Sequence, residues 1–270
     1  MGEVRLMREA VHHIRSASIF CRTQGSGPPV VLLHGFGLDQ RMWDDQVTAL
    51  GERFTMIRYD LRGYGRSSLP VSGPYSHTDD LHDLLGALSA RPAHVVGHSN
   101  GARIASRFAL AYPKDVRSLT LVNAALDGHV WSSDWQERWS AISAAAKAGN
   151  MARARRLWIE HPLFASTREQ PALATRLTEM VHAYSGWHWE HADPGIAPDP
   201  PVNQRLGQFR VPTLVMIGER DLADFRTIAL KLSSGIQGAT RANLPHAGHM
   251  ANMETPAEFN EQLATFLRAH

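Results

Sequence analysis

The sequence predicts an α/β fold in which a mostly parallel sheet carries helices on both faces. Predicted strands and helices alternate through residues 1–126 and again through 207–270, which is typical of parallel strands joined by crossover helices. Several predicted strands are continuous apolar runs, such as Val30–Leu33, as expected of strands buried on both faces. Residues 127–206 contain no predicted strand, so we interpret them as a helical insertion, called the cap below.

The elements before the cap follow from apolar runs and turn chemistry. Residues 9–24 alternate loosely between apolar and polar, which predicts two antiparallel strands, and the Gly- and Pro-rich residues 25–29 form a turn. Further strands are predicted at residues 30–33, 54–59, 93–96 and 118–122, with helices at residues 41–50, 78–89 and 102–112. The glycine-rich loop 60–67 lacks the spacing of a nucleotide-binding loop, so we interpret it as a structural turn.

Tryptophan is concentrated in the cap. Six of the seven tryptophans lie there, namely Trp131, Trp135, Trp139, Trp158, Trp187 and Trp189. The first three are four residues apart, which predicts one stripe along a helix. Prolines between residues 194 and 201 end the segment as a loop. The alternation then resumes with strands at residues 213–217 and 239–243 and helices at residues 226–232 and 256–268.

Composition and charge exclude several classes of protein. The 270 residues are 43% hydrophobic and 20% charged with a net charge of +2, which is ordinary for a globular domain. The arginines are scattered, so we expect no nucleic-acid partner. The single cysteine, Cys21, cannot form an internal disulfide or a thiolate metal site. Without a signal peptide pattern or an apolar run of membrane-spanning length, we expect a cytoplasmic protein with no membrane partner.

The pentapeptide at residues 97–101, GHSNG, is the organising feature of the chain. It follows a predicted strand and precedes a predicted helix, so Ser99 lies at a tight corner with a positive φ. Glycines two positions to either side remove the Cβ atoms that would collide with the turning backbone. The hydroxyl of Ser99 then stands at a helix N-terminus, where free N–H groups favour negative charge. This arrangement predicts a nucleophilic serine.

A serine nucleophile needs a base, and the base should lie at the carboxyl ends of the strands. The loop between the last strand and the last helix contains two histidines, His246 and His249. We favour His249, because Gly248 gives it backbone freedom and it lies nearer the helix.

The carboxylate that orients the base should also follow a strand. Asp221 comes directly after the strand at residues 213–217 and is our choice, with Glu219 and Asp224 as competitors. The preceding strand ends at Asn123, which cannot carry a charge. The order along the chain is then Ser99, Asp221, His249.

A tetrahedral intermediate needs N–H donors for its oxyanion. The turn itself supplies the backbone N–H of Asn100, and Phe36, in the loop after the strand at residues 30–33, is the best-placed second donor. We interpret His34 as a structural residue of that loop, and His98 as packed or hydrogen-bonded beneath the corner.

Taken together, these motifs resemble the α/β-hydrolase superfamily. The resemblance covers almost the whole chain outside the cap, and it is carried by residues 34–37 (HGFG), 60–67, 97–101, 221 and 247–250 (AGHM). It implies a twisted, mostly parallel eight-stranded sheet with a cap inserted between strands six and seven. Within the superfamily the sequence is most similar to small esterases, enol-lactone hydrolases and carbon–carbon bond hydrolases. Most such relatives carry Met, Leu or Gln after the nucleophile, and Asn100 departs from that pattern.

We therefore expect hydrolysis of a carboxylic ester or lactone through an acyl-enzyme, without a metal or an organic cofactor. A neutral imidazole is required as base, so activity is expected to rise through about pH 6–7. The cap tryptophans predict a preference for a small apolar or aromatic substrate. The expected pocket residues are Trp131, Trp135, Trp158, Trp187 and Met250.

Other functions use the same frame. Carbon–carbon bond hydrolases, cofactor-free perhydrolases and hydroxynitrile lyases share the three residues, whereas dehalogenases and epoxide hydrolases need an aspartate in place of Ser99. A non-catalytic small-molecule receptor on a hydrolase scaffold would also keep them. A metal site would rest on four cap residues, His182, His188, Glu190 and His191, but their spacing is not that of a zinc-binding H-E-x-x-H motif.

Overall fold

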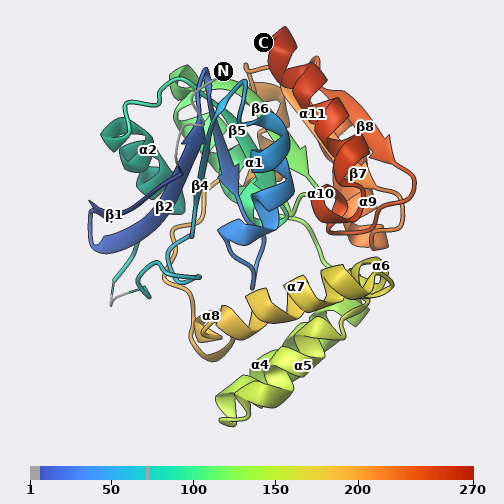
Figure 1. Cartoon of the computed structure of the whole chain (residues 1–270). Coiled ribbons are helices and arrows are strands. Elements are labelled where there is room, and N and C mark those ends of the chain that lie inside the picture. Colours follow the sequence, from blue (N-terminus) through green and yellow to red (C-terminus); the bar gives the residue numbers. More distant parts are fainter. Residues whose placement is uncertain (1–6, 71–72) are drawn as a thin grey trace.

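A single eight-stranded sheet forms the centre of the molecule in the computed structural model, which describes residues 7–70 and 73–270 (Figure 1). The strand order is β1-β2-β4-β3-β5-β6-β7-β8. Strand β2 pairs antiparallel with β1 and with β4, and all other neighbours are parallel. The strands are β1 Arg8–Ile14, β2 Ala17–Gly25, β3 Pro29–Leu33, β4 Thr55–Tyr59, β5 Ala93–His98, β6 Val116–Val122, β7 Thr213–Gly218 and β8 Thr240–Leu244. The predicted fold class is confirmed.

The central strands are buried, and this explains why their sequences are continuous apolar runs. Every residue of β5 and β7 is buried, as are the last four residues of β3 and of β4. Parallel strands covered on both faces need apolar side chains on both faces. The edge strands β1 and β8 are mostly exposed and correspondingly more polar.

Helices cover the sheet and join its strands. Those outside the cap are α1 Asp44–Leu50, α2 His77–Ala87, α3 Asn100–Ala111, α9 Ala223–Gly235, α10 Ala251–Glu254 and α11 Pro256–Ala269. Helices α1 and α11 pack together in front of the sheet in Figure 1, whereas α2 packs on α3 and α9 packs on β7. The predicted helix at residues 41–50 is in fact a 3-10 turn, Gln40–Trp43, followed by α1.

The loop at residues 60–67 is held by its own polar groups. The Asp60 carboxylate accepts hydrogen bonds from the backbone N–H of Gln40 at 3.0 Å and of Arg66 at 2.8 Å. The Ser67 hydroxyl donates to the Asp60 carbonyl at 2.5 Å. These side chains bind the backbone of the loop and of the neighbouring turn at Gln40, as expected of the structural turn that the sequence predicts.

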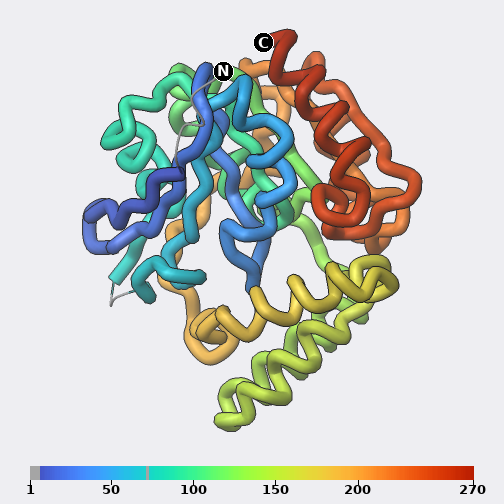
Figure 2. Tube along the Cα trace, viewed as in Figure 1, coloured from blue at the N-terminus to red at the C-terminus, as the bar shows by residue number. Residues whose placement is uncertain are grey.

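The cap helices lie between β6 and β7 in the sequence and below the sheet in Figure 1. They are α4 Ser133–Lys147, α5 Met151–Ile159, α6 Ala165–Arg168, α7 Pro171–Ala183 and α8 Trp187–Glu190. Figure 2 shows the chain leaving the sheet after β6 and returning to it before β7. Residues 123–212, all of them described, contain no strand, as the sequence predicts.

The predicted tryptophan stripe needs a correction at its first member. Trp131 is not helical, because the Ser132 hydroxyl accepts from the Trp135 N–H and begins α4 one residue later. Only Trp135 and Trp139 lie on α4. The ring of Trp131 nevertheless stacks on that of Trp135, with centroids 4.6 Å apart. The helix cap at Ser132 therefore leaves Trp131 outside α4, although its ring still packs against that of Trp135.

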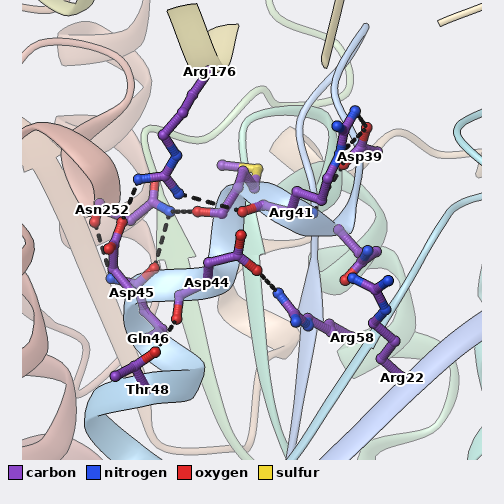
Figure 3. Close-up of polar contacts among 12 residues, drawn as sticks. Arg22, Asp39, Arg41, Asp44, Asp45, Gln46, Thr48, Arg58, Arg176 and Asn252 are labelled. Atoms are coloured by element: carbon purple, nitrogen blue, oxygen red, sulfur yellow. Dashed lines mark hydrogen bonds and ion pairs between the residues drawn. The ribbon is translucent and has the colours of Figure 1, made fainter. Parts of the chain in front are cut away.

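One cap helix is tied to the core by an arginine, as Figure 3 shows. Arg176 of α7 contacts the carboxylate of Asp45 in α1 at 2.9 Å and donates to the carbonyl oxygen of Arg41 at 3.5 Å. Beneath it, Gln46 and Asn252 are buried and exchange hydrogen bonds that join α1 to α10. The Arg176–Asp45 pair is about one-third exposed, so it positions the helix more than it stabilises the fold.

Candidate active site

Ser99 stands between β5 and α3 on a strained corner. Its backbone angles are φ 53° and ψ −113°, in a region that residues with side chains rarely adopt. A Cβ on Gly97 would collide with the carbonyl of Gly101, and one on Gly101 would collide with the carbonyl of Leu33. The two glycines therefore permit the corner, and the strain is of the kind that is retained at functional sites.

A buried carboxylate and imidazole form a hydrogen-bonded pair near this corner. His249 Nδ1 donates to Asp221 Oδ2 at 2.8 Å, and both side chains are almost fully buried. The other carboxylate oxygen of Asp221 accepts from the N–H of Leu222 at 2.7 Å. Because Nδ1 carries the shared proton, Nε2 of His249 is left as the free base.

Asn123 completes the environment of this carboxylate. Its side-chain amide donates to Asp221 Oδ2 at 2.7 Å and to the carbonyl of Gly248 at 3.2 Å. Asn123 is excluded as the acid because it carries no charge, and its supporting role was not expected from the sequence. The available signal was its place directly after β6, at the carboxyl edge of the sheet.

The loop that carries His249 is held from two sides. The carboxylate of Glu254 accepts from the backbone N–H of Gly248 at 2.5 Å and of Met250 at 3.3 Å. From below, His98 Nε2 donates to the carbonyl of His249 at 2.7 Å. Burial, with the nearby His249, holds the pKa of His98 well below its usual value, so that ring is neutral. His98 thus lies beneath the corner, as the sequence predicts.

The competing residues lie elsewhere. His246 is exposed, and Glu219 is an exposed acceptor for the side-chain amide of Asn243 at 3.0 Å. Asp224 binds the hydroxyl of Ser132 at 2.7 Å and the ring of His129 at 3.0 Å, at the start of the cap. Of the candidates considered, Asp221 and His249 are the ones that contact each other.

Ser99 and His249 line one cavity of about 500 Å³ between the sheet and the cap. Aromatic rings from the cap form much of its wall. Three of the residues expected in the pocket, Trp131, Trp135 and Trp158, line this cavity. Trp139 lines it too and was missed, although its place four residues after Trp135 was a sufficient signal.

The structure does not bring the remaining two expected pocket residues, Trp187 and Met250, to this cavity. The ring of Trp187 stacks on His191 at 4.9 Å, on the far side of the short helix α8. Met250 is fully buried, where it precedes α10. Helical phase in α8 and core packing at α10 decided these placements, and neither could be read from residue type.

Phe36 and Asn100, the expected oxyanion donors, both line the cavity. Asn100 is the first residue of α3, where helix geometry leaves the N–H without an intrahelical acceptor. Nearby, His34 Nδ1 donates to the carbonyl of Gly35 at 2.8 Å, and Nε2 accepts from the N–H of Leu61 at 3.0 Å. Both ring nitrogens of His34 are therefore engaged with backbone, which confirms its structural role in this loop.

A metal site, the cysteine and a membrane span can be checked directly in the described part of the chain. No group of three or more His, Cys, Asp or Glu side chains among those residues is arranged to hold a metal ion. Burial raises the pKa of the Cys21 thiol to about 12, which makes it a poor nucleophile. None of the described helices is both long and apolar enough to span a bilayer.

Comparison with known proteins places the chain. A sequence profile of the alpha/beta hydrolase fold matches residues 28–256. The chain is 31% identical over 261 residues to an Azorhizobium caulinodans protein named "Putative carbamate hydrolase RutD", with 94% of this chain and 96% of the relative covered. It is 24% identical to 3-oxoadipate enol-lactonase 1 of Acinetobacter baylyi, over 100% and 99% of the two chains.

A solved structure agrees with these sequence relatives. The crystal structure of a hydrolase from Pseudomonas aeruginosa matches with a TM-score of 0.76 and 28% identity, covering 97% of this chain and 98% of the other. The profile spans most of the eight-stranded sheet, and the first relative is matched along nearly its whole length. The chain belongs to the alpha/beta hydrolase family of hydrolases.

Proposed function

We propose that this protein is a serine hydrolase that cleaves a carboxylic ester or lactone of a small, largely apolar or aromatic substrate. One observation carries the proposal: the hydrogen-bonded pair of His249 and Asp221 meets the strained corner of Ser99 at a single cavity. A neutral imidazole oriented by a buried carboxylate is the arrangement that activates a serine hydroxyl.

The reaction uses these groups in turn. His249 Nε2 takes the proton of Ser99 as the hydroxyl oxygen attacks the carbonyl carbon. Asp221 keeps Nδ1 protonated and stabilises the imidazolium that forms. His249 then returns the proton to the leaving alkoxide, and an acyl-enzyme remains. Water, activated by the same imidazole, releases the acid and restores Ser99.

The developing oxyanion is stabilised by backbone N–H groups. We assign this role to Phe36 and Asn100, which line the same cavity as Ser99. Removing one such donor typically costs a factor of about 10²–10³ in kcat. The helix N-terminus at Asn100 adds a favourable field for the negative charge.

We assign substrate selection to the cap, residues 127–206, and the chemistry to residues 1–126 and 207–270. The cap contributes Trp131, Trp135, Trp139 and Trp158 to the cavity wall. These rings provide rigid apolar surface, which favours an apolar or aromatic acyl or alcohol part. The name of the first relative adds carbamates to the substrates worth testing, because a carbamate presents a carbonyl to the same three residues.

The test compares two histidines of the same loop. Ser99→Ala and His249→Ala are expected to lower kcat by about 10⁴–10⁶, because the three residues act as a unit. The matched control, His246→Ala, removes an exposed imidazole three residues away and keeps wild-type activity. The substrate panel contains p-nitrophenyl esters, lactones, carbamates and vinylogous diketones, and a fluorophosphonate probe reports covalent labelling of the serine. Undiminished turnover in Ser99→Ala contradicts the proposal.

A further inference from the structure

Arg103 brings a positive charge into the cavity one helical turn after Ser99. Its backbone N–H donates to the carbonyl of Ser99 at 3.1 Å, and its side chain lines the same cavity. Among the described residues that line this cavity, Arg103 is the only lysine or arginine. Ser99 and Arg103 line the same cavity, so a ligand bound there can contact both residues.

Within the described residues the guanidinium has little to bind. Its Nη2 donates to the Asn100 side-chain oxygen at 2.5 Å, and its buried Nε has no acceptor. No carboxylate of the described chain lies within ion-pairing distance of it. A guanidinium has five N–H donors, so several remain for a ligand.

The two nearby carboxylates are committed to other partners. Asp127 forms an ion pair with Arg107, whose Nε and Nη2 donate to the Asp127 carboxylate at 2.7 Å and 2.5 Å. Asp193 accepts from the hydroxyl of Tyr75 at 2.8 Å and from the N–H of Gly195 at 2.9 Å. Asp193 is also exposed, so water screens its charge.

The protein groups around Arg103 disfavour its charge. Burial lowers the pKa of the Arg103 guanidinium, and the neighbouring Arg107 lowers it further, against weaker opposing effects from Asp127 and Asp193. Arginine nevertheless stays protonated in proteins, and a largely buried cation without an anionic partner is costly. An anionic ligand removes that cost by forming paired, charge-assisted hydrogen bonds.

The other titratable groups at this end of the cavity do not supply a competing cation. Burial lowers the pKa of His188 to about 4 and that of His77 well below its usual value, so both rings are neutral at pH 7. The cavity thus combines apolar tryptophan walls with the positive charge of Arg103, and the one carboxylate among its described lining residues, Asp193, is exposed and bound by Tyr75 and Gly195.

We propose that Arg103 binds a carboxylate carried by the substrate, so that the preferred ester or lactone bears a second, ionised carboxyl group a short chain away from the scissile carbonyl. This inference rests on the proposed hydrolase function and narrows its substrate class to acidic esters or lactones. Arg103 is then a specificity-determining residue.

The test uses two esters of similar shape, monomethyl glutarate and methyl pentanoate, with proton release as the readout. Arg103→Met removes the charge but keeps an unbranched side chain, and Arg103→Lys keeps the charge but not the paired geometry. Wild type is expected to prefer monomethyl glutarate. In Arg103→Met its kcat/KM falls about 10- to 100-fold, mainly through KM, because a hydrogen bond to a charged group is lost. Methyl pentanoate stays within about threefold, and Arg103→Lys is intermediate.

A binding experiment separates this inference from the hydrolase function. Calorimetry measures the dissociation constant of monomethyl glutarate for Ser99→Ala and for the double variant Ser99→Ala/Arg103→Met. At least about tenfold weaker binding to the double variant supports the carboxylate site, even if neither ester is turned over. Equal binding overturns it. Equal slowing of both esters in Arg103→Met also overturns it, because Arg103 then acts only by holding the Asn100 side chain, while the hydrolase function stands.

Discussion

Asn123 shows how a single neutral side chain organises charged ones. It follows β6 directly, with a φ of 43° in the left-handed region that asparagine tolerates better than most residues. From there its amide reaches both Asp221 and the carbonyl of Gly248. Together with the N–H of Leu222, it fixes the rotation of the carboxylate so that Oδ2 faces His249. We propose that Asn123 positions the acid of the site.

Asn123→Gly tests this role without adding backbone strain, because glycine accepts a positive φ. We expect kcat to fall about tenfold, since one hydrogen bond to a charged group is lost, while KM changes little. Asn123→Ala should lose the same activity and, in addition, about 1 kcal/mol of stability from the strained φ. Steady-state kinetics and urea unfolding provide the two readouts. Wild-type kcat in both variants contradicts the positioning role.

At the scale of elements, Glu254 connects α10, the cap and the loop of His249. One carboxylate oxygen accepts from the N–H of Met250 at 3.3 Å and from the hydroxyl of Thr167 in α6 at 2.6 Å. The other accepts from the N–H of Gly248. A buried carboxylate that accepts three hydrogen bonds is held in one position. Glu254 therefore fixes both the cap and the loop that carries His249.

Two variants separate the role of Glu254 in holding the loop of His249 from its role in holding the cap. Glu254→Gln places an amide among N–H and hydroxyl donors, so at least one of them loses its acceptor, and we expect kcat to fall about 10- to 100-fold. Thr167→Val removes only the bond from the cap and leaves the loop contacts, so kcat should stay within about threefold. The comparison is made by steady-state kinetics on one small ester. Equal losses in the two variants contradict the division into loop support and cap anchoring.

The elements of the core could be predicted because their apolar patterns are local. Strands β3, β5 and β7 are buried on both faces and therefore read as apolar runs. Inside the cap, local pattern was not enough. The Ser132 hydroxyl begins α4 after Trp131, and the phase of the four-residue helix α8 turns Trp187 towards His191. Caps and helical phase depend on contacts that composition does not reveal.

At the scale of the whole molecule, five buried histidines among the described residues have a lowered pKa. His34, His94, His98, His161 and His188 are all buried, and burial lowers the pKa of each of them, to about 4 for His94, His161 and His188. In the unfolded chain a histidine has its ordinary pKa of about 6.5. Below that pH these histidines bind protons in the unfolded chain but not in the native state, so the free energy of unfolding decreases as the pH falls.

We therefore expect the free energy of unfolding to be flat above about pH 7 and to drop steadily towards pH 5, by about 1.4 kcal/mol per pH unit for each such histidine. His94 is the residue to substitute, because its ring bonds to Ser118, packs edge-on against Phe54 and is not among the residues that line the cavity. Urea unfolding of His94→Gln should lose about 2 kcal/mol less between pH 7.5 and 5.0 than wild type. His246→Gln, at an exposed position, should match wild type. An unfolding free energy that is constant from pH 7.5 to 5.0 contradicts the prediction.

The candidate site divides in the same way into predictable and unpredictable parts. Ser99, Asp221 and His249 stand at the ends of strands in a known order, so sequence could propose them. The contacts from Asn123 to Asp221 and Gly248 and from Glu254 to Thr167 join residues 87 to 125 positions apart, so they could not be read from local sequence. The sequence could not predict that Arg103 lacks an ion pair, because that depends on Asp127 binding Arg107 instead.

Phe36 has a consequence for anyone who redesigns this protein. Its ring lies against Tyr64 of the core and against five aromatic rings of the cap, namely Trp139, Trp158, Tyr184, His188 and Trp189. The same residue presents the backbone N–H that we assign to the oxyanion. Libraries that vary the cap aromatics to change selectivity will therefore also disturb turnover, and screens should score the two properties separately.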